Sequence, residues 1–89
     1  MFVSISCDLS NDDHRKKIYD LLYQYGFKKI QKNLFESYKL KEEYLSRLKR
    51  DIDRNTDFYD TIRMYQYPLN DILVITTLKE KRWRKLLVK

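Results

Sequence analysis

The stretch Phe2–Arg15, FVSISCDLSNDDHR, carries the pattern that decides the fold. Apolar side chains recur at every second position from residue 3 to residue 7, which is the period of a strand with one buried face. Asp8 ends this strand, and Ser10 followed by acidic residues is typical of the capped start of a helix. The stretch therefore predicts a strand that presents one carboxylate beside a helix N-terminus.

The hydropathy pattern predicts six further elements. A helix over about Asn11–Tyr25 ends at Gly26, because glycine adopts the left-handed conformation that stops helices. The extended segment Phe27–Tyr38 is either one bent strand or a hairpin that turns at Lys32-Asn33. A second helix is expected at Leu40–Arg54, and the strands that follow are expected at Phe58–Tyr67, Ile72–Leu78 and Leu86–Val88, with a turn at Pro68–Asp71.

This order predicts an α+β fold, a ferredoxin-like two-layer sandwich with two helices on one face of a mainly antiparallel sheet. Residues 1–78 would form the domain, and residues 79–89 a basic segment with a short C-terminal strand. The strand Ile72–Leu78 is β-branched and nearly continuous in apolar residues, which favours a buried central strand. The expected core contains Val3, Ile5, Ile18, Leu22, Leu45, Leu48, Ile62, Ile72 and Val74.

Composition limits the class of protein. The chain has 89 residues, a net charge of +6 and a pI of about 9.4, so it forms one domain that favours a polyanionic partner, unless the charge only maintains solubility. No apolar run approaches the length of a membrane span. The single cysteine, Cys7, is expected in the core and indicates a reducing cytoplasm. His14, the single histidine, is expected to be exposed.

Asp8 is the one side chain that this pattern isolates for chemistry. A lone carboxylate holds Mg²⁺ poorly, because the ion usually takes one or two carboxylates with phosphate oxygens and waters. A two-fold dimer would bring two copies of Asp8 to its axis, where they could share one ion that acts on a phosphodiester. The alternative is a local structural role, in which Asp8 bonds the amides at the helix start.

Basic residues gather in two segments. Residues 28–50 and residues 79–89 each carry an excess of five positive charges, whereas the rest of the chain is acidic. Aromatic side chains are interleaved with these charges, which suits a surface that follows a phosphate backbone. A solvated helix face and a frayed tail are the alternative interpretation.

Three stretches together resemble the small CRISPR-associated endoribonuclease family, the second of the two near-universal spacer-adaptation proteins. They are FVSISCDLSNDDHRKK (residues 2–17), YGFKKIQKNLFES (residues 25–37) and DTIRMYQYP (residues 60–68). The resemblance implies a ferredoxin-like homodimer whose C-terminal strand, Leu86–Val88, pairs with the partner subunit. It also implies a bridge between two dimers of the adaptation integrase, with spacer DNA held on a basic surface.

The resemblance further implies an Mg²⁺- or Mn²⁺-dependent endonuclease that acts on duplex DNA or single-stranded RNA. By position, Asp8 matches the metal-binding catalytic acid. The side chains expected to bind nucleic acid are Arg15, Lys17, Lys29 and Phe35, together with Lys79, Lys81, Arg82 and Arg84 of the basic C-terminal segment. Two alternatives remain at this point: a non-catalytic DNA-binding scaffold, and a related toxin-type ribonuclease that acts on messenger RNA.

Overall fold

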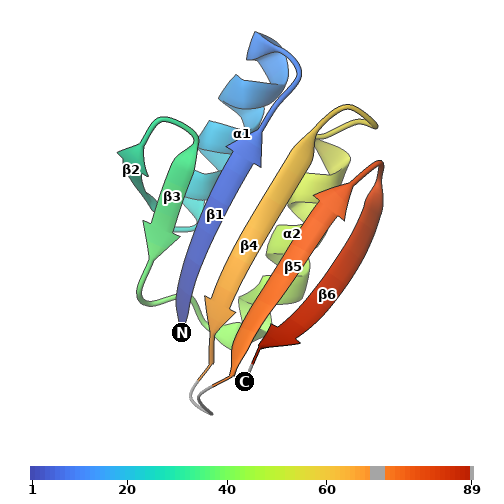
Figure 1. The fold of residues 1–89 in the computed structure, drawn as a ribbon. Coiled ribbons are helices and arrows are strands. Elements are labelled where there is room, and N and C mark those ends of the chain that lie inside the picture. The colour runs from blue at the N-terminus through green and yellow to red at the C-terminus, as the bar shows by residue number, and fades with distance from the viewer. Residues whose placement is uncertain (69–71, 89) are drawn as a thin grey trace.

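A computed structural model of the chain describes residues 1–68 and 72–88 and shows an α+β protein. Figure 1 shows its two α-helices and its six-stranded antiparallel sheet. In chain order the elements are β1 (Phe2–Asp8), α1 (Asp12–Gln24), β2 (Lys28–Gln31), β3 (Leu34–Ser37), a short 3-10 helix η1 (Glu42–Tyr44), α2 (Leu45–Arg54), β4 (Thr61–Tyr67), β5 (Leu73–Lys79) and β6 (Arg82–Val88).

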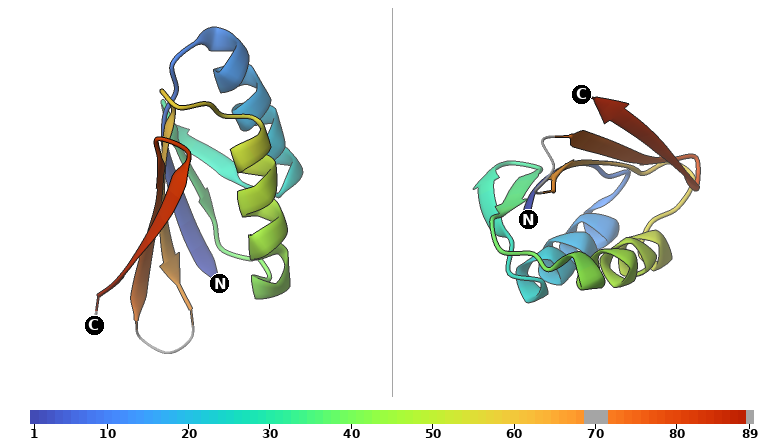
Figure 2. Two further views of the ribbon diagram at one scale, coloured as in Figure 1. Left: turned by 90° about the vertical axis from the view of Figure 1, so that its right-hand side faces the viewer. Right: turned by 90° about the horizontal axis from the view of Figure 1, so that it is seen from below.

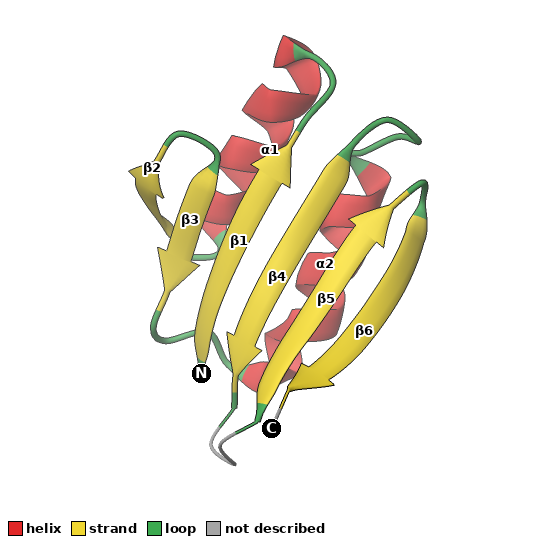
Figure 3. Cartoon of the chain, in the orientation of Figure 1, coloured by secondary structure: helices red, strands yellow, loops and turns green. Residues whose placement is uncertain are grey.

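The strands are ordered β2-β3-β1-β4-β5-β6, and every neighbouring pair is antiparallel (Figure 3). Strands β1 and β4 therefore occupy the centre of the sheet, and β6 forms one edge. Both helices lie on the same side of the sheet, as the view along the strands shows (Figure 2). The opposite face has no helix among the described residues.

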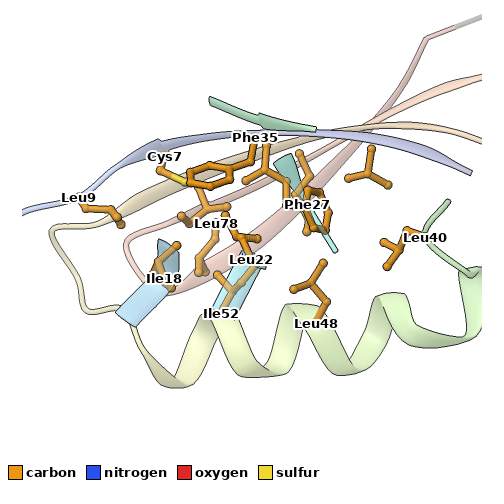
Figure 4. Packing of buried hydrophobic residues seen from close by; sticks show 14 residues of the cluster. Cys7, Leu9, Ile18, Leu22, Phe27, Phe35, Leu40, Leu48, Ile52 and Leu78 are labelled. Carbon is orange, nitrogen blue, oxygen red and sulfur yellow. The ribbon is translucent and has the colours of Figure 1, made fainter. Parts of the chain in front are cut away.

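The hydrophobic core fills the space between the sheet and the two helices (Figure 4). It is built from alternate residues of the strands and from one side of each helix. Of the predicted core, Val3, Ile5, Ile18, Leu22, Leu48 and Ile62 are buried. Leu45, Ile72 and Val74 are only partly buried. The central-strand prediction for residues 72–78 is wrong, because β1 and β4 hold the centre and β5 lies next to the edge strand.

The start of α1 differs from the prediction. Its N-cap is Asn11, whose side-chain oxygen accepts the backbone N–H of His14 at 2.8 Å, and the helix begins one residue later than expected. Ser10 does not cap the helix, because its amide and its hydroxyl both donate to Asp60. Gly26 ends the helical segment with φ +85°, as predicted.

The remaining boundaries show which local signals were misleading. The segment 27–38 forms the hairpin alternative, with Asn33 in the turn at φ 63°, but Ile30 is half exposed. The second helix begins at Leu45 and not at Leu40. Leu40 is buried, as an apolar helix residue would be, but it lies before the helix. Strand β4 begins at Thr61, because residues 55–60 form a turn. Most of the turn predicted at residues 68–71 lies outside the described residues.

The turn between β5 and β6 is attached to the end of α2. Glu80 and Lys81 both have positive φ, 54° and 60°, the conformation that a two-residue hairpin of this twist requires. The Lys81 ammonium donates to the carbonyl oxygens of Asp53 and Thr56, and it lies 2.8 Å from the Asp53 carboxylate. A cation on the last carbonyls of a helix is stabilising, so Lys81 fastens the hairpin in this conformation.

Candidate phosphate-binding face of the sheet

Asp8 lies at the C-terminal end of β1 and is exposed on the face of the sheet that no described helix covers. Its neighbours on β1 alternate with it, so Cys7 points into the core. Cys7 is buried in the core, as predicted, and burial raises the pKa of its thiol to about 12. Within the described part of the chain, the Asp8 carboxylate forms no ion pair.

Cationic side chains share this face with Asp8, on the strands to one side of β1. The register places Asp8 opposite Thr61, Thr61 opposite Lys79, and Lys79 opposite Arg82, in one row across four strands. The next row runs through Ser6, Arg63, Thr77 and Arg84. Because residues in register share a face, four cationic side chains lie on the same face as Asp8: Arg63 one strand away, Lys79 two strands away, and Arg82 and Arg84 three strands away.

The other half of this face is apolar and aromatic. Phe2 packs against Tyr38 and Tyr67, with ring centroids 5.2 and 6.1 Å away. The register continues this surface across β5 and β6, where Leu86 and Val88 are 56% and 41% exposed. A monomer rarely leaves so much apolar surface in contact with water, so this half has the character of an interface.

A buried carboxylate, Asp60, holds the end of β1 from beneath. Asp60 has no exposed surface, and it accepts bonds from the amide of Ser10 (2.7 Å) and the hydroxyl of Ser10 (2.8 Å). Its other oxygen lies 2.7 Å from Nδ1 of His14 and accepts the amide of Asp57 at 2.8 Å. These four contacts tie the β1–α1 connection to the turn before β4.

The environment of Asp60 keeps it ionised. Burial alone would raise the pKa of the Asp60 carboxyl, but the hydrogen bonds from Ser10, Asp57 and His14 outweigh burial and lower the pKa. Its charge is therefore part of the folded structure. The expectation that His14 is merely exposed is wrong, since its side chain is 20% exposed and bonded to Asp60.

A second contact set holds the other side of β1. The backbone amide of Cys7, the residue just before Asp8, donates to the Asn33 carbonyl at 2.9 Å. The Tyr19 hydroxyl donates to the Asn33 side chain at 2.6 Å and accepts the Asn33 amide at 3.0 Å. The strand end that carries Asp8 is thus fixed by helix α1, the β2–β3 turn and the turn before β4.

Two places in the structure offer candidate metal ligands. His14, Asp57 and Asp60 lie within 4.8 Å of one another, but the oxygens of Asp60 are already occupied by four donors. Mg²⁺ also prefers oxygen ligands to a histidine nitrogen. Asp8 fits the ion better, because its carboxylate is exposed and free of ion pairs among the described residues. One chain supplies a single carboxylate there, so a full site needs a second copy or substrate oxygens.

The other predicted nucleic-acid residues occupy different surroundings. Arg15 pairs with Asp12, and Lys17 lies 3.1 Å from Asp13, so both charges are partly neutralised on α1. The Lys29 ammonium lies 5.3 Å from the centroid of the Tyr19 ring. Phe35 is fully buried, with its ring against Tyr19 and Tyr23, so it has no surface with which to touch a ligand. Lys81 is engaged by the end of α2.

Sequence reasoning overlooked two members of this region. Asp60 and Arg63 belong to the stretch DTIRMYQYP that carries the family resemblance, but neither has a role predicted from the sequence. The alternation of β4 places Arg63 on the open face, where its guanidinium lies 5.4 Å from the ring of Tyr65. Asp60 precedes the strand and turns inward. Strand alternation therefore predicts the direction of Arg63, whereas no local pattern predicts that Asp60 turns inward.

The fold and the site define a small basic α+β protein with an exposed carboxylate set among cations on an open sheet face. The family model described as CRISPR associated protein Cas2 matches residues 1–72, and the chain belongs to this family. Membership implies a role in CRISPR adaptation. No curated protein and no solved structure matched the chain. None of the helices in residues 1–68 and 72–88 is long and apolar enough to cross a membrane.

Proposed function

We propose that the protein is a homodimeric CRISPR-adaptation subunit that binds nucleic acid, bridges the integrase and cleaves phosphodiesters with the help of Mg²⁺ or Mn²⁺ at Asp8. The observation that carries this proposal is that the exposed Asp8 carboxylate shares the open face with Arg63, Lys79, Arg82 and Arg84. The single buried cysteine, with no partner for an internal disulfide, suits the cytoplasm, where such a protein would meet nucleic acid.

The basic half of the face would bind the phosphate backbone. Its four cations form no ion pairs with described residues, so they can exchange counterions for phosphates. Three of them are arginines, whose planar guanidinium can hold two phosphate oxygens at once. The strands fix the spacing of these side chains, so the surface is ordered before the ligand arrives.

Replacing Arg84 with glutamine should weaken binding of a duplex DNA about 5- to 10-fold at 0.15 M salt and lower the slope of log affinity against log salt by about one. The matched control is Arg50→Gln, because Arg50 is exposed on α2, in the layer opposite this face. Fluorescence anisotropy over a salt series measures both quantities. Equal losses in the two variants would show that total charge, and not this face, determines affinity.

The apolar half of the face would pack against a second copy. An 89-residue chain that leaves Phe2, Tyr67, Leu86 and Val88 in contact with water gains from burying them in a dimer. Strand β6 is also an edge strand, so its free side could pair with the partner subunit's sheet. The antiparallel order β2-β3-β1-β4, with both helices to one side, supports classing each subunit as ferredoxin-like.

Leu86→Glu should shift the protein from dimer to monomer, because the new charge would lie in the buried apolar half of the interface. Leu87→Glu is the control on the same strand: Leu87 is 55% exposed, but alternation turns it toward the helix side. Light scattering coupled to gel filtration measures the mass of each variant. A dimer that survives Leu86→Glu, or a wild-type protein that is monomeric, contradicts the proposed interface.

Two copies of Asp8 related by the dimer axis would hold the metal ion, which would supply charge stabilisation and an activated water when bound. The chain's own residues have simpler tasks. Asp60 and Asn33 fix the end of β1 and hence the position of the Asp8 carboxylate. Arg63 and Arg84 would orient the phosphate and offset its charge. A purely scaffolding function remains the alternative, and it is favoured by the single carboxylate that each chain contributes.

A further inference from the structure

Two aromatic side chains lie exposed in the turn before β4. Phe58 and Tyr59 are 55% and 78% exposed, and their ring centroids are 5.6 Å apart with an interplanar angle of 83°. They pack against each other and are not members of the core. Adjacent exposed rings are costly in water unless a ligand covers them.

The turn that carries these rings is ordered from below. The Asp57 carboxylate accepts the amide of Tyr59 at 2.8 Å, and the Asp60 amide donates to the Asp57 carbonyl at 3.2 Å. The buried Asp60 carboxylate accepts the Asp57 amide. The backbone under the rings is therefore fixed by hydrogen bonds, so a ligand would pay little entropy to order it.

The turn that carries the rings leads directly into the phosphate-binding face. Thr61, two residues after Tyr59, pairs with Asp8 and with Lys79. The turn between β5 and β6 lies at the same end of the sheet as the connection between α2 and β4 (Figure 1). Lys81, in that turn, bonds to the Thr56 carbonyl, so basic residues border the aromatic turn.

Three acidic side chains near the rings are already engaged, whereas Asp8 and Glu80 form no ion pair with described residues. Asp53 pairs with Lys81, and Asp57 accepts the Tyr59 amide while lying 3.9 Å from Nδ1 of His14. Asp60 is buried. Two ring surfaces remain open to a ligand at the end of the sheet where Lys79 and Arg82 lie, a combination that matches a base joined to a phosphate backbone.

We propose that Phe58 and Tyr59 form a stacking platform for an unpaired nucleobase of single-stranded nucleic acid. The inference rests on the proposed nucleic-acid-binding function and adds a substrate feature to it. A base inside a duplex has both faces covered by its neighbours, whereas an unpaired base can place one face on a protein ring. The phosphates on either side of this base would then run toward Lys79 and Arg82, beside Asp8.

The test compares two fluorescein-labelled DNA probes, a single-stranded 12-mer of thymidines and a blunt duplex of equal length. The double variant Phe58→Ala/Tyr59→Ala should lose about 5- to 100-fold in affinity for the single strand and less than about twofold for the duplex. Tyr59→Phe should retain single-strand binding, because it keeps the ring. Tyr44→Ala is the control, since Tyr44 is also exposed but lies in η1, before α2, whereas Phe58 and Tyr59 follow α2.

Each outcome decides the inference. Unchanged single-strand affinity in the double variant, or equal losses on both probes, overturns it. A change in mass by light scattering in the double variant also overturns it, because the rings would then belong to a subunit interface. If the wild-type protein binds duplex but not the single strand, the platform is wrong and the proposed function stands. If it binds neither probe, the proposed function itself fails.

Discussion

Asp8→Ala should lower Mg²⁺-dependent phosphodiester cleavage by at least about 100-fold, because the variant removes the exposed carboxylate at the end of β1 that would hold the metal ion. Nucleic-acid affinity should stay the same or rise slightly, since the change deletes a negative charge beside Arg63 and Lys79. The opposite directions of the two effects separate loss of chemistry from loss of binding. Cleavage of labelled RNA and duplex DNA, followed over a series of Mg²⁺ and Mn²⁺ concentrations, provides the first measurement.

Two controls make this result specific. Asp8→Asn keeps the size of the side chain and one oxygen, so it should retain the fold and lose most of the activity. Asp20→Asn removes a carboxylate that is exposed on α1 and should change neither quantity. Asp8 also lies outside the core, so thermal melts of all three variants should match the wild type. If Asp8→Ala cleaves as well as the wild type, the catalytic assignment is wrong and the scaffolding function becomes the better conclusion.

The position of Asp8 could be predicted because it depends on local sequence. Strand alternation from residue 3 to residue 7 fixes which side chains face the helices, and Asp8 follows in phase on the other face. The same alternation placed Arg63 and Tyr65 on the open face of β4. When a strand with one buried face includes the functional residue, the alternation of the strand alone predicts which way that side chain points.

The support around Asp8 could not be predicted, because it depends on contacts between distant segments. Ser10 has the residue type and spacing of a helix cap, yet it bonds to Asp60, fifty positions away. His14 has polar neighbours in the sequence, as a surface residue would, yet its side chain bonds to the same Asp60 carboxylate. Local propensity describes each residue with its sequence neighbours only. Here the buried Asp60 carboxylate determines the positions of both the Ser10 and the His14 side chain.

The predicted central position of the strand at residues 72–78 was wrong for a related reason. Residues 72–78 have the β-branched composition of a central strand, but β5 has β6 as its outer neighbour. The open face of the sheet is apolar near Leu86, so apolar residues on both sides of β5 reflect this surface as well as the core. Composition alone does not distinguish burial beneath a helix from an apolar surface on the open face of the sheet.

Asp60→Ala should destabilise the folded protein by about 3 to 5 kcal/mol, which is a large share of the stability of a domain of this size. The substitution leaves the amides of Ser10 and Asp57 without their acceptor in a buried site, together with the His14 ring nitrogen. The melting temperature should fall by about 12 to 40 °C. Asp20→Asn, which removes an exposed carboxylate, serves as the control and should melt with the wild type.

Asp60→Asn tests the charge itself, because the amide keeps the shape of the side chain. Since folding lowers the pKa of Asp60, its ionised form stabilises the folded state above the ordinary carboxyl pKa of about 3.9. This contribution is lost as the pH falls from that value through the lower pKa of the folded state. The wild type should therefore be more stable than Asp60→Asn at pH 7, and the difference should shrink below about pH 4. Urea unfolding from pH 7 to pH 3 measures this difference, and a constant gap across the range would show that the charge of Asp60 contributes nothing.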